Sequence, residues 1–581
     1  MPRLAAPGFP VRRRRVFWRG KGFAINLEWR MRVLLISLFD EWCFGLRHIS
    51  STLKAKGHHT TMAYLRAMPE LHDNVGEGDP DGYHSPPASV RGADFRALME
   101  LTKKVNPELI GISLSFSHIY SLATEVVRRL RTVSNAKVIV GGADPTANPD
   151  MAIEWADIVC VGEGEGAIAD LADRMSAKQD YTDVPNLWVK KDGQIFKNAY
   201  RALDQELDSV PWADFDKADK FWISNGKINF QALPAGSHLL TNFPIMASRG
   251  CPYACTFCCN SLYREMYGNK DYVRLRSVEN VLAEIENYVR HNKHTHSIEF
   301  FDDVFGSRQD WLDEFAEKYP KRIGRPFFCY TYPAVAKPAF VDAIIKAGVG
   351  VVAMGLQTGS QRILKDVYKR NAPRDKTINA MKVFQARGIP VVMDLIGSNP
   401  FETEEDCLET LELLLEFPAG SYILHETNRL TFYRNYPITR KAMDSGHVGP
   451  FIDGRNVSLA ENTPERRFWN AIWQLPQFPA MDREAIRQMT KVPHLREHPE
   501  IIESMVKALV ETTYIPGTRV RRQLHEDQLV SEVARLQGSR MVKYYFGLKK
   551  LVKETLPKRM GVFTNLKSGT PRKAVELDIP T

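Results

Sequence analysis

Three cysteines lie close together near the middle of the chain, at Cys251, Cys255 and Cys258. They follow a short apolar run, Ile245 to Ala247, that is typical of a buried strand, so one loop carries all three side chains. Cysteine thiolates are the usual protein ligands of iron–sulfur clusters. A [4Fe–4S] cubane held by three thiolates keeps one iron open, just as a catalytic zinc keeps one coordination position open. The spacing therefore predicts a cluster with a free position for a ligand.

A structural zinc site is the alternative reading of these cysteines. Such a site requires a fourth cysteine or histidine at matching spacing. Cys259 is a poor fourth ligand, because adjacent side chains generally point apart. The nearest histidines are not spaced to complete the site; they are His291, His294 and His296. The cluster is therefore favoured over zinc.

The segment from Ala254 to Lys441 alternates short apolar runs with helical ones. The runs after the cysteines read as strands at Ile298–Phe301, Phe327–Thr331, Val349–Leu356, Pro390–Ile396 and Tyr422–Glu426. This alternation predicts a partial (β/α)6 TIM-like barrel of about six strands, whose chemistry lies at the carboxyl ends of the strands. Several polar residues fall at such ends, facing the cysteine loop: Asp302, Asp303, Tyr330, Gln357 and Asn399.

A second α/β region precedes the cysteines. Its five apolar strands, separated by helices, predict a doubly wound parallel sheet of Rossmann-like type, with strands at Val33–Phe39, His59–Leu65, Leu109–Ser115, Lys137–Val140 and Ile158–Val161. Ligands bind beyond the carboxyl ends of such strands. The glycines there let a backbone approach a bulky ligand, although glycines also occur as plain turn residues. No GxGxxG follows the first strand, so a dinucleotide is not favoured.

The composition is that of a globular protein. The chain has 581 residues, of which 44% are hydrophobic and 25% charged. No apolar run approaches the ~18 residues of a membrane helix. Eight cysteines are too few for a disulfide framework, so we expect a cytoplasmic protein in a reducing compartment.

The net charge of +9 is concentrated near the two ends of the chain, at Arg12–Arg15 and between Met541 and Met560. The middle of the chain is nearly balanced, and nucleic-acid binding is therefore not expected. The basic amphipathic stretch Met541–Met560 is compatible with weak contact at a membrane surface.

The cysteine loop, Ser-Arg-Gly-Cys-Pro-Tyr-x-Cys-x-Phe-Cys at residues 248–258, resembles the cluster-binding signature of the radical S-adenosylmethionine superfamily. The region before it is similar to the cobalamin-binding domain that precedes this module in one large subgroup. The likeness runs from about Met31 to Ala442. It implies a 4Fe–4S cluster on Cys251, Cys255 and Cys258, with S-adenosylmethionine and cobalamin as the other cofactors. A flavodoxin or ferredoxin is implied as the electron donor.

The resemblance also implies contacts to S-adenosylmethionine. Ile298–Asp303 matches the second barrel strand of the family, Gly355–Ser360 the segment that holds the ribose, and Gly397–Thr403 the turn near the adenine. The implied contacts are Phe257, Asp302, Gln357, Ser360, Gly397 and Asn399. Gln357 stands where the family usually has Glu, and its amide still hydrogen-bonds a hydroxyl. Phe401 stands where the family has Gly, which alters the turn.

Two further segments, Gly141–Thr146 and Gly162–Glu165, match the cobalamin-binding domain of the subgroup, with Asp144 in place of a family histidine. The implied cobalamin contacts are Gly45, Ser113, Ser115, Gly141, Gly142, Thr146, Glu163 and Gly164. Trp42 occupies the position from which other cobalamin proteins supply a histidine to cobalt, and an indole has no acceptor nitrogen. We therefore expect cobalamin without a lower histidine ligand, and His48 on the polar face of a helix.

These observations divide the chain into six parts. We expect a disordered basic leader (1–30), a cobalamin-binding domain (31–176), a linker (177–240), the radical S-adenosylmethionine barrel (241–441), a helical C-terminal domain (442–560) and a disordered tail (561–581). The leader lacks the apolar core of a signal peptide.

The resemblance favours an enzyme that methylates an unactivated carbon of a small-molecule, lipid or natural-product substrate. A cyclase or other rearrangement without net methyl transfer, similar to the anaerobic porphyrin ring-forming enzymes, is the main alternative. An RNA methylthiotransferase resembles proteins with three further N-terminal cysteines, and only Cys43 and Cys160 precede the signature here. A non-catalytic carrier has no use for the nucleoside-contact segments. The substrate and the catalytic residues are not predicted.

Overall fold

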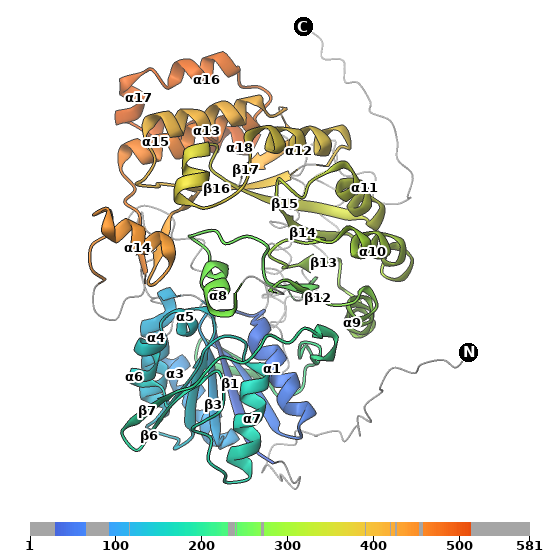
Figure 1. Cartoon of the computed structure of the whole chain (residues 1–581), viewed down its shortest axis with the longest axis vertical. Coiled ribbons are helices and arrows are strands. Elements are labelled where there is room, and N and C mark those ends of the chain that lie inside the picture. Colours follow the sequence, from blue (N-terminus) through green and yellow to red (C-terminus); the bar gives the residue numbers. More distant parts are fainter. Residues whose placement is uncertain are drawn as a thin grey trace, which may run out of the picture.

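The computed structural model describes residues 30–65, 92–115, 117–230, 239, 241–268, 272–389, 391–418, 420–424, 427–451 and 457–512. The expectations for the leader, for Met541–Met560 and for the tail fall outside these residues. Two α/β units follow each other along the long axis of the molecule, and helix α8 (Cys259–Tyr267) lies between them (Figure 1). Within the described part of the chain, no helix combines the length and the apolarity needed to cross a bilayer.

The first unit contains the predicted doubly wound sheet. Its five expected strands pair in parallel in the order β5-β4-β3-β1-β2; they are β1 (Arg32–Leu38), β2 (His59–Leu65), β3 (Leu109–Ser113), β4 (Lys137–Gly141) and β5 (Ile158–Cys160). Successive side chains of β1 enter different cores, because strand residues alternate between the two faces of a sheet. Val33 and Leu35 pack with helices α1 (Phe44–Ala55) and α7 (Glu165–Ser176). Leu34 and Ile36 pack with α3 (Gly92–Val105) and α4 (Tyr120–Leu130).

The segment 177–240 is not a bare linker, which corrects the sequence-based expectation. It extends the sheet at both edges, so that the sheet has nine strands instead of five. The hairpin of β6 (Leu187–Lys191) and β7 (Gln194–Lys197) pairs antiparallel beyond β5. At the other edge, β8 (Lys220–Ser224) pairs in parallel with β2, and β9 (Lys227–Phe230) pairs antiparallel with β8. All four strands are short. The outer strands β7 and β9 are also largely exposed, and these two therefore lack the apolar runs that mark buried strands.

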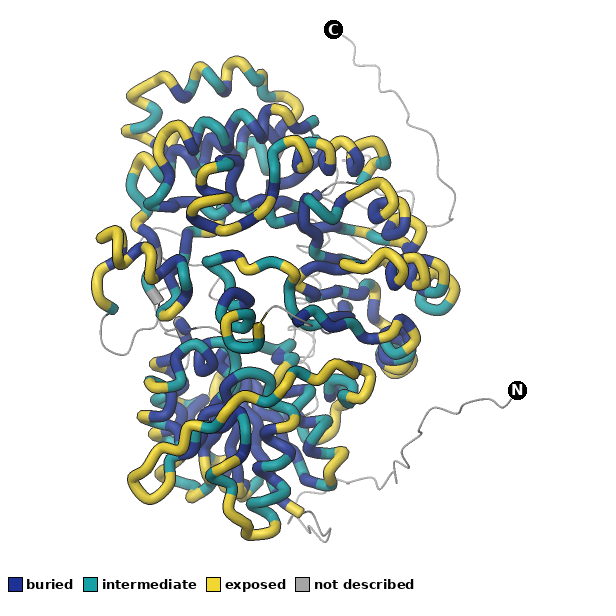
Figure 2. Tube along the Cα trace, viewed as in Figure 1, coloured by how far each residue is buried: buried dark blue, intermediate teal, exposed yellow. Residues whose placement is uncertain are grey.

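The second unit contains six parallel strands that pair in chain order, as a partial barrel requires. They are β10 (Asn242–Ile245), β13 (Ser297–Phe300), β14 (Phe327–Thr331), β15 (Val349–Gln357), β16 (Val391–Gly397) and β17 (Tyr422–Leu424). Helices follow the strands; they are α9 (Val278–His291), α10 (Gln309–Arg322), α11 (Pro338–Ala347), α12 (Arg374–Ala386) and α13 (Glu404–Glu416). Figure 2 shows the strands buried beneath exposed helical surfaces.

The C-terminal helices join the core of this second unit. They are α14 (Pro437–Asp444), α15 (Pro464–Ile472), α16 (Arg483–Met489), α17 (Pro493–Glu497) and α18 (Glu500–Thr512). Phe468, Trp469 and Trp473 are buried in the same cluster as residues of α13 and β16. The described helices therefore do not form a core of their own. The Asn470 amide on α15 reaches the end of β16, where Nδ2 donates to Ser398 Oγ at 3.1 Å.

Candidate functional site: a cysteine loop facing a glycine-lined cavity

The cysteine loop lies between β11 (Ser248–Arg249) and α8. Cys258 is the residue at the N-cap of α8, and Cys255 is buried while Cys251 and Cys258 are partly exposed. Gly250 has φ +87, and a Cβ there would lie 2.5 Å from the Tyr272 carbonyl oxygen, so only glycine fits. All three thiols are free of disulfides. The fold thus presents three thiol ligands from one loop, as the sequence predicts.

The spacing of the three sulfurs distinguishes a cluster from a single zinc ion. Zn–S bonds of about 2.3 Å in a tetrahedral site place ligand sulfurs about 3.8 Å apart. In the described residues, the sulfurs of Cys251, Cys255 and Cys258 are not all within 4.8 Å of one another. A wider spacing suits thiolates that bind separate irons of a cubane. The donor set therefore fits a [4Fe–4S] cluster better than mononuclear zinc.

Polar groups surround the cysteine sulfurs. Arg370 Nη1 lies 3.6 Å from Cys255 Sγ, and Asn260 Nδ2 lies 3.6 Å from Cys258 Sγ. A hydrogen bond from the Cys259 thiol lowers the pKa of Cys258 to about 7, whereas burial raises the pKa of Cys251 to about 12. Thiolate charge on this loop is thus supported by donors at two of the three sulfurs.

Asp302, one of the expected S-adenosylmethionine contacts, already has two protein partners. Its buried carboxylate accepts a hydrogen bond from the Ala247 amide at 3.1 Å and another from the Ser248 hydroxyl. Burial raises the pKa of Asp302 to about 6. Asp302 therefore connects the end of β13 to the start of the cysteine loop, and its contact with a nucleotide stays a prediction.

The two expected nucleoside segments lie at the ends of β15 and β16. Ser360 donates its hydroxyl to Asp406 Oδ1 at 2.5 Å, and both residues are buried. Gln357 has φ 73, and its amide lies 2.6 Å from the position of a Cβ on Gly355. Gly397 has similarly little space, because a Cβ there would come within 2.2 Å of an oxygen of α15. Both segments are thus tightly packed turns.

The expected adenine turn is joined to the cysteine loop through Tyr368. Asn399 donates from Nδ2 to the Tyr368 hydroxyl at 3.1 Å, and its Oδ1 accepts from the Phe401 amide at 3.0 Å. The Tyr368 ring lies edge-on to Phe257, with the ring centroids 4.9 Å apart. The structure therefore brings Phe257 and Asn399, two of the expected contacts, to opposite sides of one tyrosine.

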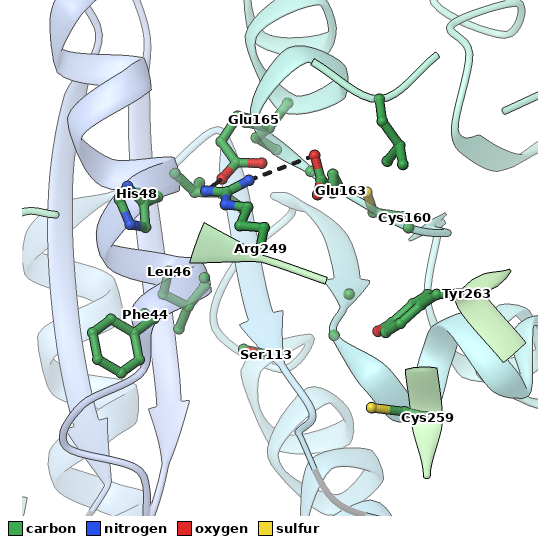
Figure 3. Close-up of a pocket in the computed structure, with 18 of the residues that line it drawn as sticks. Phe44, Leu46, His48, Ser113, Cys160, Glu163, Glu165, Arg249, Cys259 and Tyr263 are labelled. Carbon is green, nitrogen blue, oxygen red and sulfur yellow. Dashed lines mark hydrogen bonds and ion pairs between the residues drawn. The ribbon is translucent and has the colours of Figure 1, made fainter. Parts of the chain in front are cut away.

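A cavity of about 340 Å³ opens between the two units. Six of the eight expected cobalamin contacts line it, namely Gly45, Ser113, Gly141, Gly142, Glu163 and Gly164. Ser115 and Thr146 do not, although the Thr146 hydroxyl accepts a hydrogen bond from the Gly162 amide at 3.0 Å and so holds the adjacent loop. The opposite wall comes from the second unit, which carries the cysteine loop and is called the cluster unit. It includes Cys259 and Tyr263 (Figure 3), together with Asn260, Tyr267 and Asp303.

Glycines form the part of this cavity that a large flat cofactor has to approach. At Gly162, with φ +88, a Cβ would lie 1.9 Å from the Tyr267 hydroxyl. At Gly142, with φ +113, it would lie 2.5 Å from the Leu114 carbonyl oxygen. Only glycine therefore fits at these two positions. Gly141, Gly142, Gly162 and Gly164, called the glycine cradle, bring main chain to the cavity at the carboxyl ends of parallel strands, which suits the approach of a large ring such as a corrin.

Ion pairs connect the two walls of the cavity. Arg249, two residues before Cys251, lies 2.6 Å from Glu165 and 3.5 Å from Glu163 (Figure 3). Arg274 is buried and donates to Glu163 at 3.1 Å. Burial raises the pKa of Glu165, but Arg249 outweighs it and lowers the pKa to about 2. Both glutamates of the Gly162–Gly166 loop are therefore bound to the cluster unit.

His48 is not on a solvent-facing helix surface, which corrects the sequence-based expectation. It lines the wall of the cavity, half-buried, with Nδ1 3.0 Å from the Pro211 carbonyl oxygen. Because a carbonyl only accepts, Nδ1 donates this bond and Nε2 keeps its lone pair. Trp42 packs on Phe301, with ring centroids 4.5 Å apart. Cobalamin binding without a lower histidine remains a prediction.

Sequence reasoning missed Arg249, Tyr267, Tyr368 and Arg370 as site residues. Arg249 belongs to the signature, and its position directly before the cysteines is a usable signal. Tyr267 lies at the end of a helix, and Tyr368 and Arg370 lie in an irregular turn after η4 (Ile363–Val367). The spacing of these three residues in the sequence gives no sign that they belong to the site.

Comparison with known proteins agrees with this geometry. The radical SAM superfamily profile matches residues 245–414, and the B12 binding domain profile matches residues 38–172. An uncharacterized methyltransferase, PH0819 of Pyrococcus horikoshii, is 26% identical over 326 residues. That alignment covers 55% of this chain and 66% of the relative, so the chain spans just under two thirds of that protein's length.

Two solved structures share the fold. The cobalamin-dependent S-adenosylmethionine radical enzyme OxsB with aqua-cobalamin bound superposes with a TM-score of 0.58 and 15% identity, covering 85% of this chain and 75% of that one. The radical S-adenosylmethionine methyltransferase TsrM of Kitasatospora setae, with tryptophan and a SAM analogue bound, gives a TM-score of 0.54 and 16% identity. The superposition covers 72% of this chain and 77% of TsrM. The chain thus combines a radical SAM domain with a B12 binding domain, which implies a 4Fe–4S cluster, S-adenosylmethionine and cobalamin, and it shares its fold with cobalamin-dependent radical S-adenosylmethionine enzymes.

Proposed function

We propose that this enzyme is a methyltransferase that acts on an unactivated carbon of a small molecule, in the range of lipids and natural products. One observation carries the proposal. The cavity at the strand ends of the first α/β unit, called the B12 unit, has its opposite wall in α8, the helix that directly follows Cys258. The cysteine loop and the cavity are therefore neighbours, which supports transfer of a group between a cluster-bound and a cavity-bound cofactor.

The chemistry divides between the cofactors and the chain. S-Adenosylmethionine on the cluster supplies hydrogen-atom abstraction, and cobalamin supplies transfer of a methyl group. Cys251, Cys255 and Cys258 would hold the cluster, while the glycine cradle would admit the corrin. Gln357 and Asn399, near the ends of β15 and β16, would contact ribose and adenine. The protein's part is to position these groups on neighbouring elements.

Methyl transfer is supported by the relatives, since PH0819 and TsrM are both called methyltransferases. We further propose that a flavodoxin or ferredoxin supplies the electron and that the enzyme works in the cytoplasm. The eight free cysteines and the cluster loop support a reducing compartment.

The test uses the full chain, reconstituted without oxygen with iron, sulfide and cobalamin and given S-adenosylmethionine and a reductant. A methyltransferase forms both S-adenosylhomocysteine and 5′-deoxyadenosine, because one molecule of S-adenosylmethionine gives up its methyl group and a second is cleaved reductively. Formation of 5′-deoxyadenosine alone would favour a cyclase or rearrangement. Formation of neither product, with the cluster present, would contradict a radical enzyme.

A further inference from the structure

The turn after η4, residues 367–370, supports the cysteine loop from behind. The Thr256 amide donates to the Tyr368 carbonyl oxygen at 3.0 Å, and the Thr256 hydroxyl donates to the Val367 carbonyl oxygen at 2.7 Å. Thr256 follows Cys255 directly. The loop is therefore fixed to this turn at the residue next to an expected cluster ligand.

Arg370, the last residue of the turn, reaches the ligand itself. Nη1 donates to Cys255 Sγ at 3.6 Å, and Nη2 donates to the Gly355 carbonyl oxygen. Only 9% of Arg370 is exposed, and Nε is buried with no hydrogen-bond partner among the described residues. Gly355 begins the expected ribose segment. One guanidinium thus joins the cluster loop to that segment.

Two aromatic rings extend this contact along the loop. The guanidinium carbon of Arg370 lies 4.2 Å from the centroid of the Tyr332 ring. Tyr332 in turn stacks on Tyr253, with centroids 3.8 Å apart and ring planes 20° from parallel. Tyr253 lies between Cys251 and Cys255. Cation–π contact and stacking therefore hold the guanidinium in a fixed orientation against the sulfur.

We propose that Arg370 is a positioning residue that holds Cys255 and raises the reduction potential of the cluster. The proposal rests on the proposed function, because it needs a cluster on Cys255. Reduction adds negative charge to a cluster, and a hydrogen bond from a cation to a ligand sulfur stabilises the more negative state. Asn260 makes the corresponding bond to Cys258 with a neutral amide, so its effect is smaller.

The experiment measures the cluster without any substrate. The full chain and its variants Arg370→Met, Arg370→Gln and Arg374→Met are reconstituted anaerobically. Iron is counted per chain, and the midpoint potential is obtained by a redox titration followed by electron paramagnetic resonance. Arg374 is the matched control, because it lies on the adjoining helix and pairs with Glu416 at 2.6 Å. Neither Arg374 nor Glu416 belongs to the cysteine loop.

We expect Arg370→Met to make the cluster at least tenfold harder to reduce, which for one electron is about 59 mV toward more negative potential. Arg370→Gln keeps an amide donor but no charge and should give a smaller shift in the same direction. Arg374→Met should keep the wild-type potential. If Arg370→Met does not retain four irons, the midpoint potential of Arg370→Gln tests the inference instead.

Two outcomes would overturn the inference. One is that the Arg370 variants hold four irons at the wild-type potential. The other is that both lose their iron while Arg374→Met keeps it, because Arg370 would then serve only the folding of the loop. If the wild-type chain itself does not bind four irons, the proposed function fails instead, and the iron count distinguishes the two failures.

Discussion

Arg249 and Glu165 form an ion pair, at 2.6 Å, across the boundary between the cluster unit and the B12 unit. Arg249 precedes the cysteine loop, and Glu165 is the first residue of α7 beside the glycine cradle. Glu163, on the B12 unit, likewise accepts a hydrogen bond from Arg274 of the cluster unit. The relative position of the two cofactor sites is therefore set by charge as well as by packing.

Replacing Glu165 with Gln should lower the free energy of unfolding by about 2–4 kcal/mol, because the Arg249 charge is left poorly compensated in a largely buried position. Arg249 lowers the pKa of Glu165 from its ordinary value of 4.5 to about 2. The pair therefore stabilises the fold above pH 4.5, and this stability is lost as pH falls from 4.5 toward 2. Denaturant titrations across that range check both effects. Glu317→Gln, which breaks an exposed pair, should cost under about 1 kcal/mol. An equal cost for both variants would contradict the interpretation.

Glu402 in the adenine turn should make the protein less stable as pH rises. Burial raises its pKa from 4.5 to about 8, and its carboxyl accepts a hydrogen bond from the Thr358 hydroxyl at 3.0 Å. The folded state therefore keeps a proton that the unfolded state has lost, and stability falls between pH 4.5 and 8. Glu402→Gln removes this dependence and should be more stable than wild type at pH 8, by about 1–3 kcal/mol. A stability difference that stays constant from pH 5 to 8 would disprove the assignment.

Replacing Cys251, Cys255 or Cys258 with Ala should abolish the cluster, because each thiolate binds a different iron. The iron content after anaerobic reconstitution should fall from four per chain to well below one. Cys259→Ala is the control, because its sulfur is adjacent to the loop but is not an expected ligand. Retention of four irons in Cys255→Ala, or tight binding of zinc by the wild type, would rule out the proposed centre.

Gly162→Ala should reduce cobalamin binding at least tenfold. Its Cβ would meet the Tyr267 hydroxyl, and φ +88 strains any side chain. Gly193→Ala provides the matched control, since Gly193 has φ +77 with no atom within 4 Å of the new Cβ. Both variants carry the backbone strain, but only Gly162→Ala has the clash. The corrin absorbance retained after desalting measures the difference, and removal of the hydroxyl in Gly162→Ala/Tyr267→Phe should restore part of the binding. Equal retention in the two single variants would contradict the cradle.

The parts of the fold that follow from local pattern were predictable. Apolar runs such as those of β1 and β15 identify buried strands, and the spacing of Cys251, Cys255 and Cys258 identifies the loop. The edge strands β7 and β9 were not predictable, because their residues are exposed and show no apolar run. Their assignment depends on a neighbouring strand that is distant in sequence.

Some residues of the candidate site were also predictable from the sequence, and others were not. Gly141, Gly142 and Gly164 were identified from a resemblance, and the structure places all three on the cavity. Arg370 was not identified, because an arginine in an irregular turn has no periodic signal and its partner is 115 residues away. His48 was misplaced for a related reason, since the segment around Pro211 that covers it was read as a linker.

Helix α8 directly follows Cys258, an expected cluster ligand, and ends at Tyr267, which lines the cavity proposed for cobalamin. Binding of the cluster and binding of cobalamin would therefore both involve helix α8. The cluster would add a bond to Cys258 at the N-cap of this helix, beyond the hydrogen bonds that Asn260 and Ser261 already make there. We expect efficient reconstitution to require iron and sulfide first and the corrinoid second.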